Sequence, residues 1–247
     1  MLVEQTLFGV VDKVQIAVER IKAFEPPDGY FLAFSGGKDS QCIYHLAKEA
    51  DVKFDAHFHL TSVDPPEVIS FVKTHYPEVI LDQPPESMWR LIERKKIPPT
   101  RKIRYCYSKR KIMLNNDNDE ARRLFESCQL KGKHILNPIV DWLTEDVWEY
   151  LNGNGIPHCC LYDEGFHRIG CIGCPMSREK GMLREFERWP KYYAAYLRAF
   201  DRMLVARRES GLDCSFWPDA QAVMDWWIYG RKKIEWERDQ YEIELLL

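Results

Sequence analysis

The chain has 247 residues, which suits one large domain or one domain with a helical extension. Its formal net charge of −3, with 30% charged residues, excludes a globally basic nucleic-acid binder. No run approaches the roughly 20 apolar residues that span a bilayer, and the first residues lack a signal-peptide pattern, so we expect a cytoplasmic protein with no membrane partner.

Short apolar runs alternate with helical patterns in the first half of the chain. The run over 30–34 is uninterrupted, as expected for a buried parallel strand. In chain order we predict a helix over 7–24, a strand over 30–34, a helix over 39–50, a strand over 54–60, a helix over 64–75 and a strand over 79–81. This alternation predicts an α/β fold, with a parallel twisted sheet and flanking helices.

The second half of the chain is helical and rich in Trp and Tyr. Thr144 is the expected N-cap of a helix over 145–151, and residues 153–170 are expected to form a loop. Helices are expected from Arg178 onward. We predict an α/β domain over 1–152, followed over 153–247 by a cysteine-bearing loop and a helical C-terminal region in the same globule.

A glycine-rich turn, Phe-Ser-Gly-Gly-Lys-Asp-Ser over residues 34–40, joins the first strand to the next helix. Two glycines let the backbone turn tightly and present its N–H groups, and the helix N-terminus adds partial positive charge, so the turn is suited to bind phosphate. The alternative is an ordinary turn between a strand and a helix. The candidate nucleotide-binding residues of this loop are Ser35, Gly36, Gly37, Lys38, Asp39 and Ser40.

This loop lacks the spacing of a Walker A motif and resembles the PP-loop of the adenine nucleotide α-hydrolase-like enzymes. The resemblance implies that ATP binds through its pyrophosphate end and is cleaved between the α- and β-phosphates. It also implies that Lys38 and Asp39 are the catalytic residues. Mg²⁺ would neutralise the departing pyrophosphate.

Two further segments resemble the phosphoadenosine phosphosulfate (PAPS) reductase superfamily. Residues 137–150, Asn-Pro-Ile-Val-Asp-Trp-Leu-Thr-Glu-Asp-Val-Trp-Glu-Tyr, match its Asn-Pro…Trp…Val-Trp motif. Residues 161–175 are similar to the cysteine-bearing segment of its iron–sulfur members. With the PP-loop, the resemblance covers most of residues 30–205 and implies the adenine nucleotide α-hydrolase-like fold.

The chain departs from the sulfonucleotide reductases of that superfamily. Their usual C-terminal Glu-Cys-Gly nucleophile has no counterpart in residues 241–247, while the PP-loop is intact. Both departures favour an ATP pyrophosphatase, nearest to the PAPS reductase-like proteins of DNA phosphorothioation systems. Relatives also carry an extra segment after the position of Cys106, which is either absent near residues 107–111 or omitted from the sequence.

Cysteines are the candidate metal ligands. In a reducing compartment clustered cysteines indicate metal binding or catalysis rather than disulfides, and the Cys171-Ile-Gly-Cys174 spacing suits shared coordination. Zinc, an iron–sulfur cluster, a redox pair and no metal all remain open from the residues alone. The resemblance favours a [4Fe–4S] cluster, with Cys106 and Cys160 as further candidates. The predicted ligands are Cys128, Cys159, Cys171 and Cys174.

Three polar residues outside the loop are further nucleotide-binding candidates. Thr61 and Asp64 follow the second strand, where doubly wound sheets bind ligands, although Asp64 could equally cap the helix that begins at Pro65. Arg168 lies in the family-like cysteine segment and could bind an anion. Ten basic residues between Arg90 and Lys111 could face a polyphosphate or a nucleic-acid backbone, or form a solvated surface.

We therefore expect an ATP pyrophosphatase that adenylates an acceptor for sulfur transfer. The acceptor could be a nucleic acid, as in DNA phosphorothioation or tRNA thiolation, and a cysteine desulfurase could deliver the sulfur. The first alternative is a sulfonucleotide reductase that takes its thiol from a partner protein. The second is a nucleotide-binding regulator without catalysis.

Overall fold

The structure is a computed structural model that describes residues 2–7, 9–101, 103, 113–114, 125–128 and 133–230. The chain divides into two compact units. Unit 1 comprises 1–60, 65–83 and 109–170, and unit 2 comprises 61–64, 84–108 and 171–247. The two units interleave along the chain. The single division that we expected after residue 152 stays a prediction.

Unit 1 is built on a mixed sheet with a parallel core. Among the described residues, six strands pair in the order β5-β4-β3-β6-β8-β7. The strands are β3 (Tyr30–Ala33), β4 (Phe54–His59), β5 (Ile80–Asp82), β6 (Met113–Leu114), β7 (Phe125–Cys128) and β8 (Lys133–Leu136). All neighbours are parallel except β7 and β8, which are antiparallel. The predicted α/β class is thus confirmed.

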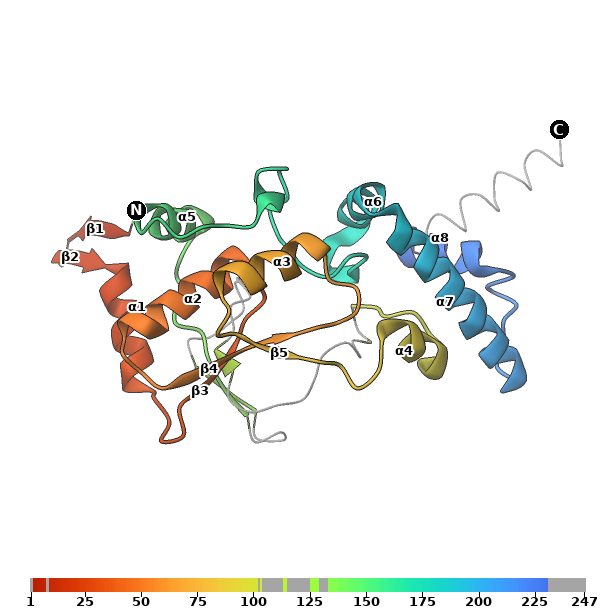
Figure 1. Cartoon of the computed structure of the whole chain (residues 1–247), viewed down its shortest axis with the longest axis horizontal. Coiled ribbons are helices and arrows are strands. Elements are labelled where there is room, and N and C mark those ends of the chain that lie inside the picture. Colours follow the sequence, from red (N-terminus) through yellow and green to blue (C-terminus); the bar gives the residue numbers. More distant parts are fainter. Residues whose placement is uncertain are drawn as a thin grey trace. The chain divides into compact units, whose positions relative to one another are not determined.

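Helices α1 (Lys13–Ala23), α2 (Lys38–Glu49) and α3 (Pro66–His75) lie on one side of strands β3, β4 and β5 (Figure 1). The strands alternate in burial, so Leu32 and Phe58 are buried at 0% and 4% exposure while their neighbours are half-buried. Buried side chains of α2 and α3, including Leu46 and Val72, complete this core. Because the connections are strand–helix–strand, the carboxyl ends of β3 and β4 meet at one edge of the sheet.

The predicted helix over 7–24 is wrong at its start. Residues Val3–Thr6 (β1) and Gly9–Asp12 (β2) form an antiparallel hairpin, and the helix begins only at Lys13. Gly9 has φ +123°, a conformation that a residue with a side chain rarely adopts. Asp12 is the N-cap and accepts hydrogen bonds from the N–H groups of Val14 and Gln15, which fixes the first turn.

Helix α5 (Thr144–Gly153), in contrast, begins one residue earlier than the predicted helix over 145–151. Thr144 is its first helical residue and Leu143 is the N-cap. The Asp146 carboxylate, in the first turn, accepts the Leu143 N–H at 2.9 Å and so satisfies the backbone N–H of the N-cap residue, whereas no side chain of the N-cap accepts a hydrogen bond from the helix.

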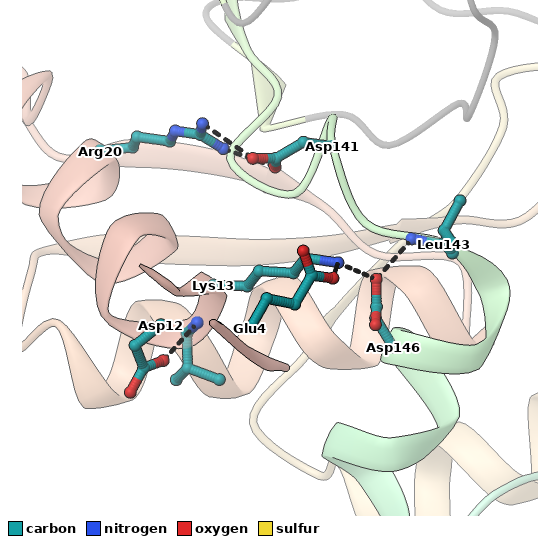
Figure 2. A network of polar contacts seen from close by, with 8 residues as sticks. Glu4, Asp12, Lys13, Arg20, Asp141, Leu143 and Asp146 are labelled. Carbon is teal, nitrogen blue, oxygen red and sulfur yellow. Dashed lines mark hydrogen bonds and ion pairs between the residues drawn. The ribbon is translucent and has the colours of Figure 1, made fainter. Parts of the chain in front are cut away.

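A buried ion pair fastens α1 to the start of α5 (Figure 2). The Lys13 ammonium lies 2.8 Å from Asp146, which is fully buried, and 2.6 Å from the more exposed Glu4. Burial by itself would raise the pKa of Asp146, but the hydrogen bonds from Lys13 and the Leu143 N–H lower it to about 2. A second pair, Arg20 with Asp141, is bidentate and lies nearer the surface.

Unit 2 is helical where it is described. It contains α4 (Met88–Lys95), η3 (Pro175–Ser177), α6 (Arg178–Arg188), α7 (Pro190–Glu209) and α8 (Ala220–Tyr229). Its core is aromatic: Tyr196 packs against Trp89, Phe186 and Trp227, and the Trp227 indole donates to the Pro99 carbonyl. The expected helical C-terminal region is confirmed to Tyr229. Over the described parts of both units, no helix has the length and apolar character that a bilayer crossing requires.

Candidate functional site

The glycine-rich loop lies in unit 1 between the end of β3 and the start of α2, as predicted. Gly36 makes its turn possible, with φ +70°. A Cβ at this position would lie 2.9 Å from Val72 and 3.1 Å from Val68, side chains of α3 that are themselves buried. Gly36 is therefore required both for backbone conformation and for the close approach of α3.

Hydroxyl groups shape the inside of the loop. The Ser40 hydroxyl donates to the Gly37 carbonyl at 2.9 Å and accepts the Ser35 N–H at 3.2 Å. The Ser35 hydroxyl lies 3.1 Å from that of Ser40 and accepts the Gly37 N–H at 3.4 Å. These bonds hold the loop in the open turn that precedes the N-terminus of α2, where N–H groups and the helix dipole favour an anion.

Lys38 and Asp39 form an ion pair at the first turn of α2. The Lys38 ammonium donates to Asp39 at 2.7 Å, and their side chains are 10% and 30% exposed. The paired arrangement suits a phosphate site, because the ammonium can turn to a phosphate oxygen while the carboxylate turns to a hard cation such as Mg²⁺. The two predicted catalytic residues are thus adjacent in space.

Two residues that sequence reasoning missed also support the loop. The phenol oxygen of Tyr162 accepts the Lys38 N–H at 2.8 Å. The Gln41 side chain, fully buried in α2, donates to the Gly36 carbonyl at 3.1 Å. Gln41 follows the loop directly, so a polar residue at a buried helix position was an available signal, whereas Tyr162 lies 124 residues from its partner and gives none.

Thr61 and Asp64 lie in unit 2, together with Cys171. The Asp64 carboxylate accepts the Thr61 N–H at 2.6 Å and the Thr61 hydroxyl at 2.8 Å, and the same hydroxyl lies 3.3 Å from the Cys171 sulfur. Asp64 does not cap α3, whose N-cap is Pro65 with no side-chain hydrogen bond. The alternative that Asp64 caps α3 is therefore wrong. Its carboxylate instead stabilises the turn from Thr61 to Asp64, beside Cys171.

The Cys171–Cys174 turn is held by a residue from α6. The Glu185 carboxylate accepts the Gly173 N–H at 2.7 Å and the Ser177 hydroxyl at 2.6 Å. Gly173 has φ +72°, and a Cβ there would lie 2.7 Å from the Phe186 ring. Glu185 and Gly173 were not among the predicted site residues, although a glycine between two cysteines of a tight turn is a signal.

The predicted cysteine ligands are not brought into one described group. Cys159 is fully buried in unit 1, where burial raises the pKa of its thiol to about 11, whereas Cys171 and Cys174 belong to unit 2. A [4Fe–4S] cluster needs several cysteine thiolates around one point. Within the described residues, no group of three or more Cys, His, Asp or Glu could hold a metal ion. Because the Cys128 side chain lies outside the described residues, the cluster and its four ligands stay a prediction.

The structure does not test the predicted roles of several site residues. The side chains of Cys106 and Cys128 lie outside the described residues, as do positions 102 and 104–111 of the basic run. Arg168 is exposed in unit 1, and Cys160 is exposed beside Cys159. The described part of the basic run includes α4, where Arg94 pairs with Glu86 on the surface.

Residues 116–177 match the model of the phosphoadenosine phosphosulfate reductase domain. An adenosine 5'-phosphosulfate reductase of Neisseria meningitidis is 42% identical over 59 residues, which are 24% of this chain and 24% of the relative. A Caenorhabditis briggsae protein named "Probable FAD synthase" is 30% identical over 182 residues, which are 68% of this chain and 35% of the relative.

A third relative, an uncharacterized protein of Methanocaldococcus jannaschii, is 29% identical over 194 residues, which are 69% of this chain and 47% of the relative. The chain therefore spans less than half the length of each of these three relatives.

Proposed function

Because the chain belongs to the phosphoadenosine phosphosulfate reductase superfamily, we propose that it is an ATP pyrophosphatase that adenylates an acceptor. The observation that carries this proposal is the complete phosphate loop. Gly36 turns the chain, the N-terminus of α2 faces the turn, and Lys38 and Asp39 stand together at its first turn. Similarity to a relative named as a FAD synthase supports adenylyl chemistry, because such a transfer also releases pyrophosphate from ATP.

In the proposed reaction an acceptor oxygen attacks the α-phosphorus of ATP. The bond between that phosphorus and the bridging oxygen to the β-phosphate breaks, and pyrophosphate leaves with both electrons of that bond. The Lys38 ammonium and the loop N–H groups stabilise the negative charge that develops on the pyrophosphate. Mg²⁺, held by phosphate oxygens and the Asp39 carboxylate, would supply further charge neutralisation.

The adenylated acceptor is activated for attack by sulfur, with AMP as the leaving group. We propose a nucleic acid as the acceptor, either a DNA phosphate or a tRNA base. The basic run from Arg90 to Lys111 motivates this choice, because clustered cations bind a phosphate backbone. A persulfide delivered by a cysteine desulfurase is the proposed sulfur source: its terminal sulfur displaces AMP, and a second thiol then cleaves the S–S bond to the carrier and forms a disulfide with it, so the acceptor keeps one sulfur. Thr61, Asp64 and Arg168 are kept as proposed nucleotide-binding residues.

The test is pyrophosphate release from Mg·ATP by the full chain, purified without oxygen and supplied with tRNA or DNA. Lys38→Ala and Asp39→Ala should each lower release by about 10- to 100-fold, since a hydrogen bond to a charged group contributes about 1.5–3 kcal/mol. Lys48→Ala is the matched control, because this lysine lies on the same helix but pairs with Glu78 at the surface. Release that persists unchanged in both loop variants would refute the proposal.

A sulfonucleotide reductase is the second candidate, favoured by the match of residues 116–177 to the reductase domain and by the adenosine 5'-phosphosulfate reductase relative. Sulfite produced from a sulfonucleotide with a partner thiol, together with no release from ATP, would establish it. Tight ATP binding without either reaction would instead identify a nucleotide-binding regulator.

A further inference from the structure

One side chain from far along the sequence lies on the phosphate loop. The Tyr162 phenol oxygen is 2.8 Å from the Lys38 nitrogen, and it lies 3.4 Å from the point where a Cβ on Gly37 would be. Lys38 is the first residue of α2, a helix of 12 residues, so its N–H is one of the donors that the helix leaves unpaired. The phenol thus occupies the place of an anion oxygen at this N-terminus.

The phenol is held there by its surroundings. Tyr162 ends the short helix η2 (Cys160–Tyr162), its N–H donates to the Cys159 carbonyl, and its own carbonyl accepts the Gly165 N–H at 2.9 Å. Trp148 packs edge-on against the ring, with 4.9 Å between centroids and an interplanar angle of 90°. The position of the oxygen is therefore set before any ligand arrives.

The phenol also keeps a hydrogen to donate. Burial raises the pKa of Tyr162 and outweighs the Lys38 N–H, which lowers it, so the phenol is protonated at neutral pH. The phenol oxygen accepts from Lys38, and no described residue accepts its hydrogen. A partly buried O–H beside an anion site is most stable when a ligand oxygen accepts that hydrogen.

We propose that Tyr162 is a phosphate-binding residue of this loop, whose phenol accepts the Lys38 N–H and donates its hydrogen to the pyrophosphate end of the nucleotide. This inference rests on the proposed function, because it assumes that the loop binds a nucleotide. A hydroxyl that accepts one hydrogen bond becomes a stronger donor in the next, so the phenol extends the reach of the Lys38 N–H to the phosphate.

The test measures binding of Mg·ATP, Mg·pyrophosphate and AMP to the full chain by calorimetry. Tyr162→Phe should weaken the binding of ATP and of pyrophosphate by the same factor, about 10- to 100-fold. The binding of AMP should be unchanged, because AMP lacks the pyrophosphate end. Tyr150→Phe is the matched control in unit 1, since its phenol donates to Glu49 at 3.2 Å instead of contacting the loop.

Each outcome decides the question. If Tyr162→Phe binds pyrophosphate as tightly as the wild type or more tightly, the inference is overturned, because the phenol would then contribute nothing to binding or would block the Lys38 N–H. Equal weakening of all three ligands overturns it in favour of a structural role. Should Tyr162→Phe unfold more easily than Tyr150→Phe, Tyr162→His decides, since its ring N–H should restore pyrophosphate binding. No binding of ATP or pyrophosphate by the wild type refutes the proposed function itself.

Discussion

Replacing Gly36 by alanine tests whether the turn of the phosphate loop depends on the absence of a side chain. At φ +70° an L-residue costs about 1–2 kcal/mol. The added Cβ would also lie 2.9 Å from the Val72 methyl and 3.1 Å from the Val68 methyl. Because Val72 is fully buried and cannot move aside into solvent, overpacking adds about 1–3 kcal/mol. The expected loss of unfolding free energy is thus about 2–5 kcal/mol.

Gly155 provides a matched control in the same unit. It has φ +61° at the end of α5, and nothing lies within 4 Å of the point where its Cβ would be. Gly155→Ala should therefore lower the unfolding free energy only by the cost of the left-handed backbone conformation, about 1–2 kcal/mol. The difference between the two variants isolates the close approach of α3 to the loop.

Urea unfolding of both variants gives the free energies of unfolding. Titration with Mg·pyrophosphate, without urea and at a temperature where both variants are folded, gives the binding affinity. Gly36→Ala should lose pyrophosphate binding, while Gly155→Ala should bind like the wild type. Equal destabilisation by the two substitutions, or wild-type pyrophosphate binding by Gly36→Ala, would show that the loop does not need this glycine in the way described.

Two further predictions concern the buried ion pair and the cysteines. The pKa of Asp146 is about 2 in the folded protein, below its ordinary value of 3.8, so its contribution of about 2 kcal/mol to the unfolding free energy should be present above pH 4 and lost as pH falls toward 2. Asp146→Asn should remove this acid dependence in urea unfolding, whereas Asp141→Asn, whose side chain is 43% exposed, should change stability by less than about 1 kcal/mol. Iron analysis of anaerobically purified protein should find about four iron atoms per chain, as the predicted cluster requires, and Cys171→Ser with Cys174→Ser should abolish them. Cys42→Ser is the control, because this thiol is buried against the Val147 carbonyl, and iron retained in the double variant would exclude these ligands.

The parallel sheet and its first helices were predictable because their signals are local. The apolar run over 30–34 and the Gly-Gly turn after it identify a buried strand and the helix that follows, and both occur where expected. The N-terminal hairpin was not predictable in the same way, since Val10, Val11 and Val14 fit helical spacing until Gly9 is seen at φ +123°. Short strands such as β6, with two residues, carry too little pattern to be recognised.

In the candidate site too, the local features were predictable from the sequence and the long-range contacts were not. Residues 35–40 are contiguous, so their sequence predicts the loop and the structure assembles it. The contact of Tyr162 with Lys38 depends on a long-range approach that no periodicity reveals. Similarly, Asp64 meets Cys171 only because a backbone bond from Ile172 to Val63 joins segments more than 100 residues apart.

The order of strands in the sheet bears on how the protein folds during synthesis. Strands β3, β4 and β5 are consecutive along the chain and adjacent in the sheet, so they can pair before the residues that follow β5 have been synthesised. The other side of β3 pairs with β6, about 80 residues later, and Tyr162 emerges later still. We therefore expect a ribosome-bound intermediate that has its phosphate loop but not the phenol upon it, so the nucleotide would bind with full strength only once translation has passed η2.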